Sequence, residues 1–137
     1  LYGGTPEAIK HSIMYGRMAV MPSWEGPLGG AQGVDQATNY VRKLAGLSHD
    51  ESLAAAGQPK FETLCAGCHM ADGTGNVALG APNLTDNVWL YGGSPRAINE
   101  SIAKGRNGVM PAYVEFLGEA KVYILAAYVY SLSNPAQ

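Results

Sequence analysis

Residues 64–69 read LCAGCH, and this short stretch decides the expected fold. The thiols of Cys65 and Cys68 lie three residues apart along one turn, where they can bond the two vinyl groups of a haem. The adjacent His69 then faces the iron as an axial ligand. These two cysteines are the only ones in the chain, too few for a disulfide scaffold. The motif therefore predicts one covalently bound haem c per chain.

A Cys-x-x-Cys pair has two other common uses besides haem attachment. A redox dithiol usually accompanies a βαβ pattern, which the sequence does not show. A zinc site needs two further ligands, and the remaining histidines, His11 and His49, are distant and lack ligand-like spacing. The adjacent histidine favours haem over both alternatives.

A methionine is the expected second axial ligand, because a thioether sulfur commonly completes a c-type haem site. Met110 stands 41 residues after His69, in a loop after a predicted helix, and Pro111 stiffens the chain beyond it. Met70 is beside His69 and cannot reach the opposite face of the same haem. Met110 is therefore the predicted ligand, although any methionine can also serve as core filler.

The chain contains an internal repeat. Residues 1–24, LYGGTPEAIKHSIMYGRMAVMPSW, align without gaps with residues 90–113, LYGGSPRAINESIAKGRNGVMPAY, and 14 of the 24 positions are identical. Such self-similarity indicates a duplicated unit. We expect residues 1–47 to be the C-terminal remnant of a first domain and residues 48–137 to be a complete second domain. Met21 matches Met110 and would be the axial ligand of a haem bound further upstream.

Helix signals dominate the remaining sequence. Ser or Thr followed by Pro predicts helix starts near residues 5 and 94, and Gly16 and Gly105 predict the ends of those helices. Apolar spacing predicts helices over residues 28–44 and 119–131. A capping pattern at Ser48 predicts another helix towards Cys65, with a fresh start favoured near Pro59. Residues 70–88 are expected to form a loop. No strand is expected, so the predicted fold is all-α with long loops.

Several further residues are candidates for the surroundings of a haem. The GAPNL stretch at residues 80–84 can offer a backbone carbonyl to the second ring nitrogen of His69, with Pro82 at its centre. An arginine precedes each Met-Pro pair and would either pair with a haem propionate or remain solvated. The aromatic candidates would either wall the haem or fill the core. These arginine and aromatic candidates are Arg17, Arg106, Trp89, Tyr91 and Tyr113.

Composition restricts the remaining possibilities. The 137 residues are 47% hydrophobic and 15% charged, which is enough apolar content for a packed core. The net charge is −2 and no basic run occurs, which argues against a nucleic-acid partner. No apolar window approaches the ~18 residues of a membrane span. The chain has no signal peptide and does not begin with Met, so we expect a processed or truncated piece.

Residues 50–137 resemble a class I cytochrome c domain, with a helix, CAGCH, GAPNL, GVMPA and a C-terminal helix in order. The tandem arrangement, and residues 83–113 in particular, resemble the diheme cytochrome c subunit of cbb3-type cytochrome c oxidases. The resemblance implies thioether bonds at Cys65 and Cys68, and axial ligation by His69 and Met110. It also implies that Met21 served an upstream haem. That family carries an N-terminal membrane anchor and a first CxxCH, neither of which is in this chain.

The resemblance also implies a function. A His/Met-ligated haem has no open coordination position, so we expect electron transfer and no enzymatic activity of the chain alone. Electrons would come from a soluble cytochrome c and pass to other oxidase subunits, at the periplasmic face of the bacterial inner membrane. One alternative is a free diheme electron carrier that is not attached to an oxidase. A ligand-binding or peroxidase-like haem protein is a second alternative.

Overall fold

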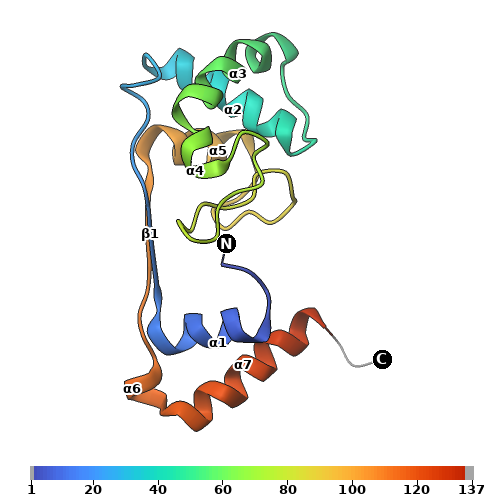
Figure 1. Ribbon diagram of the computed structural model, residues 1–137. Coiled ribbons are helices and arrows are strands. Elements are labelled where there is room, and N and C mark those ends of the chain that lie inside the picture. Colours follow the sequence, from blue (N-terminus) through green and yellow to red (C-terminus); the bar gives the residue numbers. More distant parts are fainter. Residues whose placement is uncertain (1, 135–137) are drawn as a thin grey trace. The chain divides into compact units, whose positions relative to one another are not determined.

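The computed structural model describes residues 2–134, and Figure 1 shows its helices and strands. Among these residues, no helix is long and apolar enough to cross a membrane. The elements follow one another as α1 (Pro6–Tyr15), β1 (Arg17–Met21), α2 (Ala31–Leu44), α3 (Glu51–Leu64), α4 (Ala66–His69), α5 (Pro95–Lys104), β2 (Arg106–Met110), α6 (Val114–Leu117) and α7 (Glu119–Ser133).

The repeated helices α1 and α5 begin and end where the sequence predicts. The side chains of Thr5 and Ser94 accept hydrogen bonds from backbone N–H groups in the first turns, and a proline follows each of them. Gly16 and Gly105 end the two helices at φ values of 71° and 74°, which an L side chain rarely adopts. Local capping chemistry therefore sets both helices.

Helix α3 differs from the expectation of a fresh start at Pro59. It runs unbroken from Glu51 to Leu64, and Asp50 caps its first turn by accepting from the N–H of Leu53. A proline inside a helix leaves the carbonyl four residues earlier without its partner. Here both Ala55 and Pro59 are exposed, so water can satisfy that carbonyl. The helix continues because its other face is buried.

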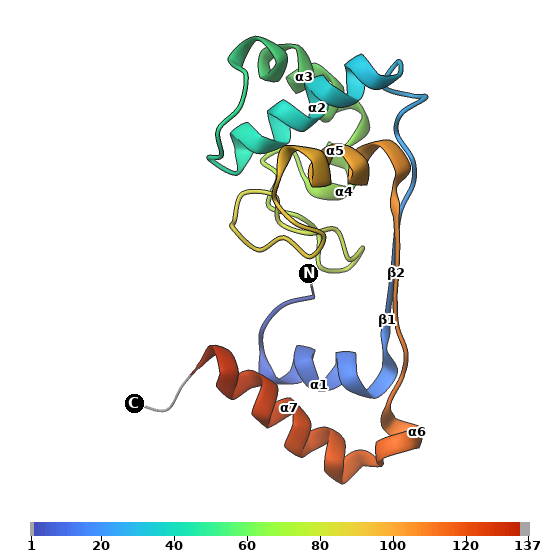
Figure 2. The same ribbon diagram turned by 180° about the vertical axis from the view of Figure 1, so that it is seen from behind.

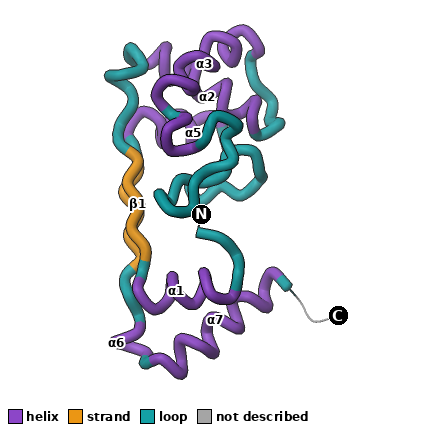
Figure 3. Tube along the Cα trace, viewed as in Figure 1, coloured by secondary structure: helices purple, strands orange, loops and turns teal. Residues whose placement is uncertain are grey.

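The absence of strands was also predicted, and this prediction is wrong. Strands β1 and β2 pair to form a two-stranded sheet, as Figures 2 and 3 show. They are the two copies of one repeated segment. Each strand is too short to show a clear alternation in sequence, and its partner is almost 90 residues away. Only the folded chain brings these backbone groups together.

The described residues form two compact units, one from a long continuous segment and one from two segments that are far apart in the sequence. The expected division after residue 47 stays a prediction. Among the described residues, unit 1 contains Val20–Arg106, and unit 2 contains Tyr2–Ala19 together with residues 107–134. The chain passes from unit 2 to unit 1 within β1, and back within β2. Each unit thus combines the helix of one repeat copy with the Met-Pro segment and last helix of the other copy.

Unit 1 is built on the packing of α2 against α3 and α5. Gly57 of α3 lies directly on the backbone of α2: a Cβ atom there would be 2.1 Å from the carbonyl oxygen of Gln36. The rings of Tyr40 and Phe61 meet at a centroid distance of 5.2 Å. The missing side chain of Gly57 therefore allows a close helix crossing. The buried core comprises Leu28, Val34, Ala37, Tyr40, Val41, Phe61, Leu84, Ile98 and Ile102.

Unit 2 is smaller and is built on the packing of α1 against α7, with α6 beside them. Its buried core comprises Ile13, Met14, Val122 and Ala126. The same backbone bond recurs in both units at the repeat spacing of 89 residues. In unit 2 the N–H of Tyr113 donates to the carbonyl of Ile13 at 3.0 Å, and in unit 1 the N–H of Trp24 donates to Ile102 at 3.0 Å. The two copies have exchanged equivalent segments.

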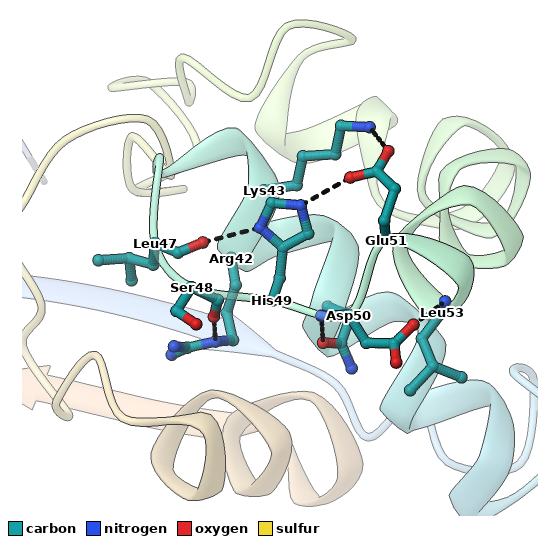
Figure 4. Close-up of polar contacts among 9 residues, drawn as sticks. Arg42, Lys43, Leu47, Ser48, His49, Asp50, Glu51 and Leu53 are labelled. Carbon is teal, nitrogen blue, oxygen red and sulfur yellow. Dashed lines mark hydrogen bonds and ion pairs between the residues drawn. The ribbon is translucent and has the colours of Figure 1, made fainter.

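A polar network joins the end of α2 to the start of α3, as Figure 4 shows. Arg42 donates to the carbonyl oxygens of Ser48, at 2.7 Å, and Gly93, at 3.0 Å. Glu51 pairs with both Lys43 and His49. These contacts fix the short connection between two helices that belong to different repeat copies.

Candidate functional site

The Cys-x-x-Cys-His motif lies where α3 ends. The N–H of Cys65 donates the last hydrogen bond of α3, and the single-turn helix α4 begins at the next residue. The carbonyl of Cys65 accepts from the N–H groups of Cys68, at 3.1 Å, and His69, at 3.0 Å. The local hydrogen bonds thus hold both thiols and the imidazole on one tight turn, and both thiols are free.

The His69 ring is buried and oriented. Its exposed fraction is 7%, and Nδ1 lies 3.1 Å from the carbonyl oxygen of Pro82. Because a carbonyl can only accept, Nδ1 carries the proton and Nε2 is left with its lone pair. The bond is the one expected from the GAPNL stretch.

The loop between His69 and Pro82 closes tightly at a glycine that the sequence analysis did not single out. Gly75 has a φ of 84°, and a Cβ atom there would be 2.6 Å from the backbone of Ala81, Pro82 and Asn83. Its N–H donates to the carbonyl of His69 at 2.9 Å. The sequence signal that could have identified Gly75 is its position midway between the Cys-x-x-Cys-His motif and the GAPNL stretch. Gly75 therefore supports the position of the Pro82 carbonyl.

The electrostatics of the motif favour metal ligation over redox exchange by a dithiol. Burial lowers the pKa of His69, which keeps the imidazole neutral and able to bind a metal. Burial also raises the pKa of Cys65 to about 11. A redox-active cysteine needs a lowered pKa, because the thiolate is the nucleophile. Among the described residues, no three His, Cys, Asp or Glu side chains gather as a metal site.

The chemistry of these groups fits a covalently attached haem. Cys65 and Cys68 would hold it through thioether bonds, and His69 would offer Nε2 to the iron. The carbonyl of Pro82 would fix the ring, as such second partners usually do for metal-bound histidines. Fold and site together define a c-type cytochrome domain, largely helical and with one small sheet.

The two Met-Pro segments lie in different units. Met21 is in unit 1, where it is partly buried against the same core as Cys65 and Trp89. Met110, the ligand that the sequence predicts, is in unit 2 and is 38% exposed. The structure thus brings Met21 into one unit with His69, and it does not do so for Met110.

The other candidates are also divided between the units. Trp89 packs against the core of unit 1, and Gly93 lies on its ring. Arg106 donates from Nε to Ser101 Oγ at 3.0 Å and stacks on Tyr91 at 4.5 Å from the ring centroid. Tyr113 is in unit 2.

Arg17 repeats the environment of Arg106 within unit 2. It bonds Ser12 at 2.9 Å and stacks on Tyr2 at 4.5 Å. Each arginine is therefore held by its own repeat copy, independently of the exchanged segments.

Comparison with known proteins agrees with this class. Residues 52–129 match the family model described as "Cytochrome C oxidase, cbb3-type, subunit III". The chain is 39% identical over 134 residues to the cbb3-type cytochrome c oxidase subunit CcoP of Rubrivivax gelatinosus, and 98% of the chain is covered. It is 40% identical over 144 residues to subunit FixP of Bradyrhizobium diazoefficiens, with the same coverage.

The chain belongs to the family of cbb3-type cytochrome c oxidase subunit III. It spans about half the length of the curated relatives it matches, with 44% of the Rubrivivax protein and 50% of the Bradyrhizobium protein covered. The resemblance noted in the sequence is thereby confirmed.

Proposed function

We propose that this chain transfers electrons through one c-type haem bound to Cys65, Cys68 and His69. The observation that carries the proposal is the buried His69 ring, which the carbonyl of Pro82 orients. Two thiols precede this ring on the same turn. When bound, the haem supplies a reversible one-electron couple between ferric and ferrous iron. Cys65 and Cys68 would hold the haem, and the Pro82 carbonyl orients the His69 imidazole that would bind the iron. With both axial positions filled, the chain alone would not be an enzyme.

A methionine sulfur would complete the proposed site, and the candidates are the two methionines that precede a proline. The order of motifs along the sequence predicts Met110. The structure supports Met21 instead, because it lies in the same unit as His69 and against the same core as Cys65. Gly105 also closes onto the Met21-Pro22 backbone, where a Cβ atom would be 2.3 Å from the carbonyl oxygen of Met21. We therefore propose Met21 as the ligand of this haem, with Met110 serving a haem bound upstream.

Matched variants separate the two methionines. Leucine nearly preserves the volume of methionine but cannot bind iron. In the haem-loaded chain, Met21→Leu should abolish the sulfur-to-iron band at the red end of the ferric spectrum, and Met110→Leu should leave it unchanged. The reverse result would restore Met110 as the ligand. The intact mass of the chain should be measured first. A mass that does not include one haem would contradict the whole proposal.

In the full-length protein, we propose that electrons arrive from a soluble cytochrome c and leave towards other oxidase subunits, on the periplasmic side of the membrane. The names of the relatives, all oxidase subunits, support this role. Copurification with the other subunits distinguishes it from a free diheme carrier. Rapid and complete binding of carbon monoxide to the reduced chain would instead favour a ligand-binding or peroxidase-like haem protein.

A further inference from the structure

The carbonyl that orients the His69 ring belongs to a residue that cannot fix its own position by donating a hydrogen bond. Pro82 has no N–H group, and its carbonyl oxygen lies 3.1 Å from His69 Nδ1. The place of this carbonyl therefore depends on the residues before and after Pro82. On the following side, the N–H of Leu84 donates to the carbonyl of Gly73 at 2.7 Å. On the preceding side, the chain is held by a short hairpin.

This hairpin, residues 76–81, closes through a pair of backbone hydrogen bonds. The N–H of Asn76 donates to the carbonyl of Ala81 at 2.9 Å, and the N–H of Ala81 donates back to Asn76 at 3.0 Å. Immediately before the hairpin, the N–H of Gly75 donates to the carbonyl of His69 at 2.9 Å. One end of the hairpin thus holds the backbone of His69, and the other end leads into the carbonyl that holds its ring.

The side chain of Asn76 defines the turn of this hairpin. Its Oδ1 accepts from the N–H groups of Ala78, at 3.0 Å, and Leu79, at 3.4 Å. Such an Asx turn replaces a backbone partner and favours a tight reversal of the chain. Residues 77–79 are exposed, so side-chain packing does little to fix the turn, whereas Asn76 itself is partly buried. The geometry of the turn therefore depends on one amide oxygen.

We propose that Asn76 is a positioning residue for the haem site, acting through the hairpin and the Pro82 carbonyl on the His69 ring. The inference rests on the proposed function, because it concerns the imidazole that would bind the iron. A hydrogen bond from Nδ1 to a carbonyl raises the basicity of a metal-bound imidazole. A more basic ligand favours ferric over ferrous iron, which carries the smaller positive charge. Loosening the hairpin should therefore make the haem-loaded chain easier to reduce.

Redox titration of the haem-loaded chain tests the proposal. Asn76→Ala removes the acceptor of the turn and should raise the equilibrium constant for reduction by up to about tenfold, which corresponds to about 59 mV for one electron. Asn76→Ser retains a neutral oxygen that accepts more weakly. It should give a smaller shift in the same direction. An unchanged equilibrium in both variants, or a shift towards the ferric form, would overturn the proposal.

Asn99→Ala is the matched control. Asn99 is a neutral residue of α5 in the same unit, and its Nδ2 donates to Oδ1 of Asp35 in α2 at 3.2 Å. The variant loses a side-chain hydrogen bond of unit 1 outside the hairpin, so its redox equilibrium should match that of the unmodified chain. A shift equal to that of Asn76→Ala would show that general loosening of unit 1 is the cause, and would overturn the specific role of Asn76.

The ring of His69 gives a second readout. Its Nδ1 proton, followed by NMR in the reduced haem-loaded chain, should exchange with water about tenfold faster in Asn76→Ala, because the bond to Pro82 opens more often. An unchanged exchange rate would overturn the proposal. If Asn76→Ala does not load haem, Asn76→Ser provides both readouts. Intact mass keeps the two hypotheses apart: an unmodified chain without haem contradicts the proposed function, whereas loaded variants that all behave alike contradict only the role of Asn76.

Discussion

His69 is prepared for a metal by its neighbours in sequence and by one residue from across the loop. The turn that starts at Cys65 places the imidazole, and the Pro82 carbonyl fixes which nitrogen is protonated. Burial then lowers the pKa, so the ring is neutral. The Cys-x-x-Cys-His motif made the position of the imidazole predictable. The GAPNL stretch made its hydrogen bond to a backbone carbonyl a reasonable expectation. The support from Gly75 depends on the closure of the loop, for which the sequence has no strong signal.

Gly75 gives a residue-scale prediction. Gly75→Ala should lower the free energy of unfolding by about 2–4 kcal/mol, because it adds a left-handed backbone penalty to a clash with Pro82. Gly46→Ala is the matched control, since φ is 66° but nothing lies within 4 Å of the added atom. It should cost only about 1–2 kcal/mol. Urea unfolding measures both, and equal losses would show that the clash is relieved without cost.

At the scale of elements, the α2–α3 connection contains a histidine whose partners require a charge. His49 Nδ1 faces the carbonyl of Leu47 at 2.8 Å, and Nε2 faces Glu51 at 2.9 Å. Both partners are acceptors, so both nitrogens must donate, and the ring is satisfied only as the cation. The Leu47 bond first, and then the Glu51 bond, raise the pKa, although Lys43 nearby opposes them.

This network predicts a pH-dependent stability. Because the folded-state pKa of His49 is raised, its contribution is fully present below the ordinary value of 6.5 and is lost as the pH rises through the folded value. His49→Gln should therefore destabilise unit 1 most below pH 6.5, with a deficit that shrinks at alkaline pH. Urea unfolding of the wild-type chain and of His49→Gln measures this deficit at each pH. The range stays above the ordinary Glu pKa of 4.5, so that Glu51 remains ionised.

Glu51→Gln is the control for the His49 prediction. It should reduce the pH dependence without removing it, because the Leu47 carbonyl remains. A deficit of His49→Gln that is constant with pH would show that packing, and not charge, explains the effect.

For the whole molecule, the decisive event is the exchange of equivalent segments between the two repeat copies. Helix α3 pairs with α2, from the first copy, although α7 belongs to its own copy. A steric reason is visible at Gly57. Its close approach needs a small residue on the partner, and α2 offers Ala37 where α7 has Leu125. The better fit at this crossing favours α2.

Because the exchanged units have separate cores, their stabilities should respond separately. Phe61→Ala should cost about 3–5 kcal/mol and speed amide exchange in α2, α3 and α5. Val122→Ala should cost about 2 kcal/mol and speed exchange in α1, α6 and α7. Both side chains are fully buried, in unit 1 and unit 2 respectively. Hydrogen exchange read by mass spectrometry shows which unit is affected in each variant. Faster exchange spread evenly over both units would contradict the prediction.

Local patterns were enough to locate most of the helices and the Cys-x-x-Cys-His motif, because caps, apolar spacing and ligand spacing act over a few residues. They also identified the repeat, and with it both Met-Pro segments. Other features depended on tertiary packing: the unbroken α3 with Pro59 on its solvent side, the pairing of β1 with β2, and the placement of Met21 in the unit of His69. Two near copies of a helix have nearly the same local preferences. Only the fit of their side chains against a common partner decides which copy is chosen.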